Sequence, residues 1–310
     1  MLFGTTRGGK CSDENAPGHC GLPLGRRASE PQDYGFRDKS IHKRKLRGAL
    51  VTHAFMSQPA VEFSRVHKSF IPGKPVLTDL SFSLGPEEVI AIVGKSGRGK
   101  STILRLAAGL LAPDSGSITW ARRASDTALE VMLMNQKSSL FPWATALSNV
   151  VIALEAHCAD KSKAKQAAEE LLTTLGLRQS MNQYPAELSG GMRQRVALAQ
   201  AIAGKPHLLL LDEPFGALDA LTREEIQVEF MKWRSLHRAS TLLVTHSIEE
   251  AAFLADRILV MRGIEPTCFA EFSASDLDKD ELSHDAGYRF RPEFVELVGQ
   301  VRSVLRDTEG

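Results

Sequence analysis

The stretch Val89-Ile-Ala-Ile-Val-Gly-Lys-Ser-Gly-Arg-Gly-Lys-Ser101 joins an apolar run to a glycine-rich turn, and the helix-favouring stretch 102–108 follows directly. Residues 94–101 fit the pattern G-x-x-x-x-G-K-[ST] in the strand–loop–helix setting that the pattern requires. Glycines let backbone N–H groups turn toward anionic oxygens, and the following helix points its positive dipole end at them. The stretch therefore predicts a triphosphate-binding loop; the alternative is a tight turn between a buried strand and a helix.

The loop supplies two side chains with predictable roles. Lys100 is expected to reach the β- and γ-phosphates, and Ser101 to ligate Mg²⁺. The residues predicted here to bind the nucleotide are Gly94, Lys95, Ser96, Gly97, Arg98, Gly99, Lys100, Ser101 and Thr102.

Composition excludes several classes of protein. The chain has 310 residues and is 43% hydrophobic, so it can build a core. It carries 38 basic against 37 acidic residues, and a net charge of +1 gives no bulk electrostatic argument for binding nucleic acid. No apolar stretch has the length of a membrane span. Four cysteines lie far apart without C-x-x-C spacing, which favours free thiols over a metal site: Cys11, Cys20, Cys158 and Cys268.

Polar and basic residues dominate the first part of the chain. Residues 1–56 lack periodicity and include the basic run 42–47, so we expect a disordered extension. Met56 offers an alternative translation start, which would place the first strand near the N-terminus.

Beyond this extension, hydrophobic patterns predict an α/β protein. Strands are expected at 61–66, 80–84 after a turn at 72–75, 116–120, 129–134, 208–211, 241–245 and 257–261. A helical block is expected at 145–175 and a helix at 226–236. Residues 272–284 are polar and predict a loop, and Pro292 opens an amphipathic helix to 305. Buried parallel strands alternating with helices indicate an α/β sheet with an inserted helical subdomain.

Two further motifs follow the loop. Leu208-Leu-Leu-Leu-Asp-Glu-Pro214 is a buried strand that delivers two carboxylates, of which Asp212 can hold Mg²⁺ and Glu213 can orient an attacking water. Leu188-Ser-Gly-Gly-Met-Arg-Gln-Arg195 opens a helix with a serine and two glycines, a second anion-receptive N-terminus. We interpret this second cradle as serving the γ-phosphate bound by another copy; the alternative is an N-capped helix.

With these motifs in this order, the chain resembles the ATP-binding subunit of an ATP-binding cassette (ABC) transporter over residues 61–261. The resemblance implies a P-loop ABC ATPase core with an antiparallel β subdomain and an inserted α-helical subdomain. It implies boundaries at 57–262 for the ATPase domain, about 137–195 for the helical subdomain and 263–310 for a C-terminal tail.

The resemblance also implies roles for single residues. Phe70 would stack on adenine, or else fill the core. Gln136 would touch Mg²⁺ or the attacking water, and His246 the γ-phosphate, making Glu213, His246 and Gln136 the catalytic set and Ser101, Gln136 and Asp212 the Mg²⁺ set. Asp219 would cross a dimer seam, or else cap the next helix. The ATP of the other copy would meet Ser189, Gly190 and Gly191.

Within the family, Ser139-Leu-Phe-Pro-Trp-Ala-Thr145 resembles a segment of importers for nitrate, aliphatic sulfonates and taurine. Trp143 is then expected near the groove for a permease; the alternative is a core aromatic. The segment 263–270 and the N-terminal extension depart from that group. The resemblance implies a head-to-tail homodimer, membrane permease subunits, indirectly a solute-binding protein, no nucleic acid, and a peripheral place on the cytoplasmic face of the inner membrane. The alternative function is a soluble regulatory ABC-type ATPase without a permease.

Overall fold

The computed structural model describes residues 58–121, 130–136, 140–156, 160–262, 267–274 and 286–307. The sequence predictions for the extension 1–56, its basic run 42–47 and the start at Met56 lie outside these residues, as do Cys11, Cys20 and Cys158.

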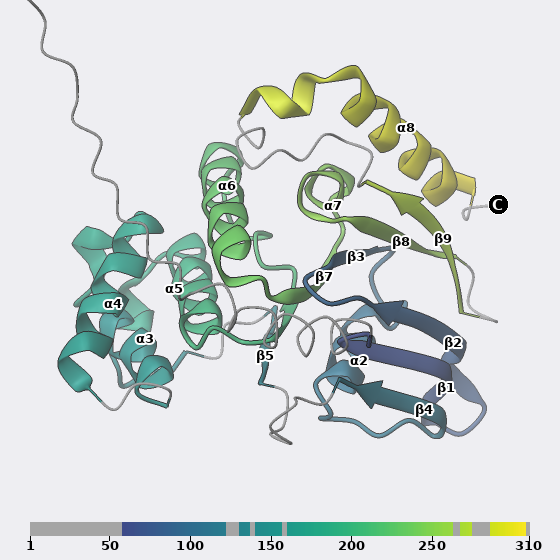
Figure 1. The fold of residues 1–310 in the computed structure, drawn as a ribbon, viewed down its shortest axis with the longest axis horizontal. Coiled ribbons are helices and arrows are strands. Elements are labelled where there is room, and N and C mark those ends of the chain that lie inside the picture. The colour runs from purple at the N-terminus through teal and green to yellow at the C-terminus, as the bar shows by residue number, and fades with distance from the viewer. Residues whose placement is uncertain are drawn as a thin grey trace, which may run out of the picture. The chain divides into compact units, whose positions relative to one another are not determined.

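A six-stranded sheet forms the centre of the structure, in the order β5-β6-β7-β3-β8-β9 (Figure 1). Its strands are β5 Val131–Met134, β6 Leu208–Asp212, β7 Ser240–Thr245, β3 Val89–Val93, β8 Arg257–Arg262 and β9 Cys268–Ser273. The first five are parallel, and β9 runs antiparallel to β8. Strands β3, β6 and β7 are buried along their whole length, as the continuous apolar runs predict for a sheet covered on both faces.

Alternate residues of the central strands enter different cores. Leu209 and Leu211 of β6 join the cluster that contains α5 and α7, whereas Leu208 and Leu210 join the cluster that contains Ile103 and Leu104 of α2. This division follows from the two-residue period of a strand.

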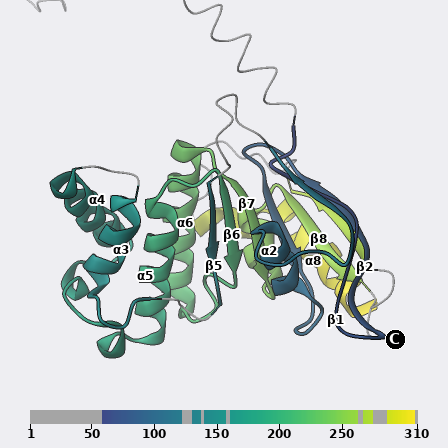
Figure 2. The same cartoon turned by 90° about the horizontal axis from the view of Figure 1, so that it is seen from below.

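A separate three-stranded antiparallel sheet, β2-β1-β4, packs on the α2 side of the molecule (Figure 2). It consists of β1 Val61–Ile71, β2 Lys74–Leu84 and β4 Ser115–Trp120. The β1–β2 hairpin is longer than the sequence predicts, because pairing continues to Ile71 and Lys74 and the turn occupies only two residues. The antiparallel subdomain of the expected fold is therefore present.

The helices are α2 Lys100–Ala107, α3 Ala146–Glu155, α4 Lys161–Thr174, α5 Gly190–Ala203, α6 Ala220–His237, α7 Ile248–Leu254 and α8 Pro292–Asp307. Short 3₁₀ turns are η1 Arg178–Ser180, η2 Pro185–Glu187 and η3 Ala286–Phe290. Helices α3, α4 and α5 pack against one another to one side of the sheet, as an inserted helical subdomain requires (Figure 1). The predicted helix at Pro292 is α8, which contacts α7, β8 and β9.

Three sequence predictions are corrected. The helical block 145–175 is two helices, because Asp160 accepts hydrogen bonds from the N–H groups of Ser162 and Lys163 and starts α4 anew. The helix expected at 226 begins at Ala220. Residues 272 and 273, expected in a loop, end strand β9, because Phe272 packs on the core despite its polar neighbours; residues 275–284 of that loop lie outside the described part.

Candidate functional site

Residues 94–99 connect β3 to α2 and border a pocket of about 350 Å³. Ten of the predicted site residues line it, together with Val76: Phe70, Ser96, Gly97, Gly99, Lys100, Ser101, Thr102, Gln136, Asp212 and Glu213. The structure thus brings together residues that are up to 143 positions apart in the chain, from Phe70 to Glu213.

The loop conformation requires glycine at one position above all. Gly99 has φ +89°, and a Cβ placed there would lie 2.8 Å from Cγ1 of Val76 and 3.0 Å from Cδ2 of Leu77. A side chain would clash and would also strain the backbone. Gly99 therefore lets the loop lie close against β2 while the helix begins at the next residue.

Lys100 is buried at the start of α2, where its ammonium holds the loop together. Its Nζ donates to the carbonyl oxygens of Gly94 at 2.7 Å and Lys95 at 2.8 Å. An ammonium has three donors, so one remains that can serve a ligand in the pocket that Lys100 lines. Burial lowers the pKa of Lys100, while the negative charges of Glu213 and Asp212 raise it.

Asp212 ends β6 and lines the same pocket as this lysine. Burial raises the pKa of Asp212, and the hydrogen bond from the Ser101 hydroxyl and the positive charge of Lys100 act in the other direction. A carboxylate beside a hydroxyl is an oxygen donor pair of the kind that Mg²⁺ prefers. The residues predicted for Mg²⁺ therefore fit the ion in chemistry and in proximity.

Glu213 is held from several directions. It adopts φ +49°, the left-handed region that costs a non-glycine residue about 1–3 kcal/mol. Its N–H donates to the carbonyl of Val244 at 2.8 Å. Oε2 accepts from Nε2 of Gln136 at 2.7 Å, and Oε1 lies 3.4 Å from Nδ1 of His246. Two residues of the predicted catalytic set, Gln136 and His246, therefore each contact the carboxylate of the third, Glu213.

Phe70 lies near the end of β1 and is 56% exposed, so it is not a core residue. It lines the pocket with its ring accessible, and Nζ of Lys68 lies 5.9 Å from the ring centroid. An exposed aromatic face at the mouth of a polar pocket suits a flat heterocycle.

The second cradle lies outside the pocket. Ser189 caps α5 by accepting from the N–H of Met192 at 3.2 Å, and Asp219 caps α6 by accepting from the N–H of Thr222 at 3.1 Å. Gly190 has open space around its Cβ position, whereas a Cβ on Gly191 would lie 3.1 Å from Leu218. None of Ser189, Gly190, Gly191 and Asp219 lines the pocket at the glycine-rich loop of their own chain. The two caps fit both interpretations of the sequence, a cradle for another copy's phosphate and a plain N-capped helix.

Sequence reasoning missed one residue at this site. Gln194 of α5 is only 6% exposed and donates from Nε2 to the carbonyl oxygen of Glu213 at 2.6 Å. Its Oε1 accepts from the N–H of Ala217 at 2.7 Å. The available signal was a polar amide among apolar neighbours on the buried face of a helix.

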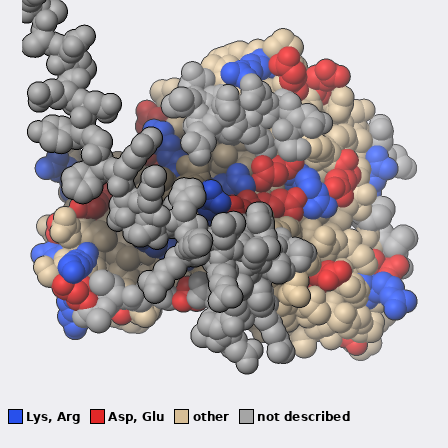
Figure 3. Space-filling view, viewed as in Figure 1, with Lys and Arg blue, Asp and Glu red and all other residues tan. Residues whose placement is uncertain are grey.

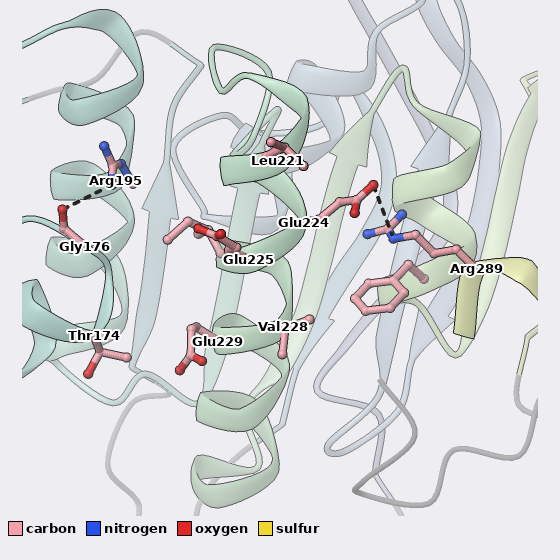
Figure 4. Close-up of a pocket in the computed structure, with 11 residues that line it drawn as sticks. Thr174, Gly176, Arg195, Leu221, Glu224, Glu225, Val228, Glu229 and Arg289 are labelled. Carbon is pink, nitrogen blue, oxygen red and sulfur yellow. Dashed lines mark hydrogen bonds and ion pairs between the residues drawn. The ribbon is translucent and has the colours of Figure 1, made fainter. Parts of the chain in front are cut away.

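A second cavity, of about 630 Å³, lies among α4, α5 and α6 and reaches Phe253 of α7 and Arg289 of η3 (Figure 4). Figure 4 shows Glu224 and Arg289 pointing toward one another, with their charged atoms 4.0 Å apart. This cavity is larger than the pocket at the glycine-rich loop, yet it contains none of the predicted site residues. The choice of the pocket at the glycine-rich loop as the candidate site therefore rests on the chemistry of its lining residues and not on its volume.

On the face drawn in Figure 3, basic and acidic side chains of the described residues are interspersed among neutral ones. Within the part of the chain that is described, no helix combines the length and hydropathy needed to cross a bilayer. Trp143 is 73% exposed, so the alternative that it fills a core is wrong.

Comparisons with known proteins agree with the geometry. A family model described as ABC transporter matches residues 77–216. Bicarbonate transport ATP-binding protein CmpD of Synechocystis sp. is 40% identical over 244 residues, which cover 76% of this chain and 86% of that protein. Aliphatic sulfonates import ATP-binding protein SsuB 1 of Burkholderia cenocepacia is 46% identical over 230 residues, covering 74% of this chain and 68% of that protein.

Among solved structures, the chain is similar to a dimeric ATP-binding cassette in a post-hydrolysis state bound to ADP and Pi. The TM-score is 0.62 and the identity 28%, over 69% of this chain and 98% of the other.

Proposed function

Because the chain belongs to the ABC transporter family and is an ATPase of that family, we propose that it energises an import complex for a small solute such as nitrate, a sulfonate or taurine. Its relatives are named for bicarbonate transport and for aliphatic sulfonate import. These names favour import over the alternative of a regulatory ATPase without a permease. Bicarbonate and sulfonates are both small anionic solutes, and we propose a solute of the same chemical class for the complex that contains this chain.

We assign ATP binding to the pocket at the glycine-rich loop. Loop residues 94–99 and the N-terminus of α2 surround the phosphates with N–H donors, and the third donor of Lys100 reaches the β- and γ-phosphates. Phe70 stacks on the adenine. Ser101, Asp212 and Gln136 would hold Mg²⁺, which would neutralise charge on the phosphate oxygens.

Glu213 is the residue that aligns the attacking water. Its carboxylate is bracketed by Gln136 on one oxygen and His246 on the other, so it cannot rotate freely. His246, at the end of β7 and 62% exposed, is accessible to the γ-phosphate. Little covalent participation is needed, because positioning and charge stabilisation carry most of phosphoryl transfer.

We propose that two copies assemble head to tail with two nucleotides between them. Ser189, Gly190, Gly191 and Asp219 lie outside their own pocket, and a Cβ on Gly190 would meet open space. A helix N-terminus with exposed glycine can approach a phosphate from a second chain. The similar cassette solved as a dimer supports this arrangement.

The partners follow from the same proposal. Membrane permease subunits would carry the solute, and the exposed Trp143, with its ring centroid 5.3 Å from that of Phe141, would meet them. A solute-binding protein would act indirectly, through the permease. The chain would lie peripherally on the cytoplasmic face of the inner membrane. ATP-driven closure of the two copies would reorient the permease, and hydrolysis would reset it.

The observation that carries the proposal is the contact of Gln136 and His246 with the two carboxylate oxygens of Glu213, in a pocket that the buried residues Lys100 and Asp212 also line. The test is solute uptake in a strain that lacks the chain, measured with sulfonates, taurine, nitrate and bicarbonate. We expect loss of uptake of one of these solutes, restored by the wild-type chain and not by Glu213→Gln. Unchanged uptake of all four would contradict the proposal.

A further inference from the structure

The side-chain amide of Gln194 links the helix that carries the cradle 189–191 to the segment 213–217. In the proposed dimer, these two parts of the chain serve different nucleotides. Gln194 lies on the first turns of α5, immediately after the cradle 189–191 that is proposed to serve the other copy's nucleotide. Its two hydrogen bonds reach the backbone of Glu213 and of Ala217, at 2.6 and 2.7 Å. One buried side chain therefore touches both the residue that aligns water and the segment that leads to Asp219.

These bonds act on a strained and tightly packed segment. Glu213 has φ +49°, so its conformation persists only if its surroundings fix it. Val244 fixes its N–H side at 2.8 Å, and Gln194 fixes its carbonyl. On the cradle side, the backbone of Gly191 packs closely against the same segment, since a Cβ added there would lie 3.3 Å from the carbonyl oxygen of Ala217.

We infer that Gln194 is a positioning residue that couples the cradle of one half-site to the catalytic glutamate of the same chain. This inference rests on the proposed function, because the coupling matters only if two copies share two nucleotides. When the cradle closes on the partner's γ-phosphate, α5 moves as a unit, and Gln194 transmits that movement to the Glu213 carbonyl. Each site then becomes competent for hydrolysis only when the other is occupied, and ATP dependence is cooperative.

Two variants change the bonds of Gln194, and a third variant is the control. Gln194→Met keeps the length of the side chain and removes both bonds. Gln194→Glu keeps the acceptor for the Ala217 N–H and loses the donor to the Glu213 carbonyl while it is ionised. The control is Gln200→Met, which makes the same change on the same helix at a partly buried glutamine outside the contacts of Glu213 and Ala217.

The experiment measures ATP hydrolysis by the full chain in its complex with the permease, as a function of ATP concentration and pH. For Gln194→Met we expect kcat to fall about tenfold or more, KM to stay within about twofold, and the Hill coefficient to fall toward one. Gln200→Met should match wild type. For Gln194→Glu, the ratio of its kcat to that of wild type should rise as pH falls, because the protonated carboxyl can again donate to Glu213.

Two results would overturn the inference. The first is wild-type kcat and cooperativity in Gln194→Met; the second is a Gln194→Glu to wild-type ratio that does not change with pH. Thermal unfolding and binding of a fluorescent ATP analogue show whether each variant is folded. If Gln194→Met does not fold, the pH dependence of Gln194→Glu tests the inference on its own. Failure of the wild-type complex to hydrolyse ATP would overturn the proposed function as well, so the two failures are distinguishable.

Discussion

At the scale of single residues, Glu213, which we propose as the general base for water, is fixed in both its backbone and its side chain. Its backbone is fixed at both ends of the peptide, by Val244 and Gln194, and its side chain is fixed by Gln136 and His246. A base that is held in place loses little entropy when the water arrives. We therefore expect a change at Glu213 to lower the rate of ATP hydrolysis far more than it lowers the affinity for ATP.

Replacement of Glu213 with Gln tests that expectation. The amide keeps the shape of the side chain and loses the charge that aligns water, so kcat should fall about 10²–10³-fold, as for loss of about 2.7–4 kcal/mol of transition-state stabilisation. ATP affinity should change little. Single-turnover hydrolysis and equilibrium binding measure the two quantities; hydrolysis close to the wild-type rate would show that another group is the base.

Glu250 predicts a pH dependence of stability. It is buried at the start of α7, and burial raises its pKa from 4.5 to about 8, against the hydrogen bond from Thr245 and the charges of Arg223 and Arg289. Between pH 4.5 and pH 8 the carboxyl of Glu250 stays protonated in the folded state and is ionised in the unfolded state. The contribution of Glu250 to the free energy of unfolding is therefore full below pH 4.5 and is lost as pH rises toward 8.

Replacement of Glu250 with Gln removes this titration. The melting temperature of the variant should exceed that of wild type by an amount that grows between pH 5 and pH 8, reflecting up to about 1.4 kcal/mol per pH unit. Thermal unfolding followed by circular dichroism over that range measures the difference. Glu249→Gln, at the exposed neighbouring position, is the control. Parallel curves for wild type and Glu250→Gln would contradict the prediction.

At the scale of elements, the segment before α3 depends on one buried amide. Asn149 is fully buried, and its Oδ1 accepts from the N–H of Phe141 at 2.7 Å. Its Nδ2 donates to the carbonyl oxygens of Phe141, Ala144 and Thr145 at 3.0–3.2 Å. The turn that presents Trp143 is therefore built around a single side chain of the following helix.

Asn149→Ala should loosen this turn. Loss of the amide leaves buried backbone groups without partners and should lower the free energy of unfolding by about 1–3 kcal/mol. Chemical denaturation measures the loss, and limited proteolysis should show faster cleavage near residues 140–145. The exposed Asn182→Ala is the matched control. Equal stability and equal cleavage of the two variants would mean that the turn does not depend on Asn149.

At the scale of the whole molecule, the proposed dimer makes a prediction about which surfaces meet. One chain with Ser96→Cys and a second with Gly190→Cys, both otherwise free of cysteine, should become joined by a short thiol crosslinker. Gly190 accepts a side chain because a Cβ there meets nothing within 4 Å. The crosslink should need ATP and a Glu213→Gln background, which keeps the nucleotide bound.

Crosslinking is read by the mass of the product on a denaturing gel. The control pair has its second cysteine on strand β9 instead of α5. It combines Glu271→Cys with Ser96→Cys in chains that have no other cysteine, and it should stay unlinked. Equal crosslinking of both pairs, or none in the trapped state, would rule out the head-to-tail arrangement.

Much of this molecule could be predicted from local patterns. The loop 94–101, the carboxylate pair after β6 and the capped start of α5 are each contiguous in sequence, and their chemistry depends on spacing within one turn. The strand β9 was missed, because Glu271 and Ser273 mask the alternation that places Ala270 and Phe272 against the core. The sequence did not predict the division into α3 and α4, because it depends on a single capping residue, Asp160, within a stretch of helix-favouring composition.

The sequence by itself determined the α/β class, the nucleotide loop and the identity of the acidic residues, since apolar periodicity and glycine spacing are local properties. Only the tertiary structure decided how Glu213 is oriented and that Gln194 holds its backbone. Those contacts join β6, β7 and α5 across residues 136–246, and a hydrogen bond between distant segments leaves no periodic trace in the chain. The physical reason is that burial of an amide beside a strained backbone is set by packing, which neither segment specifies alone.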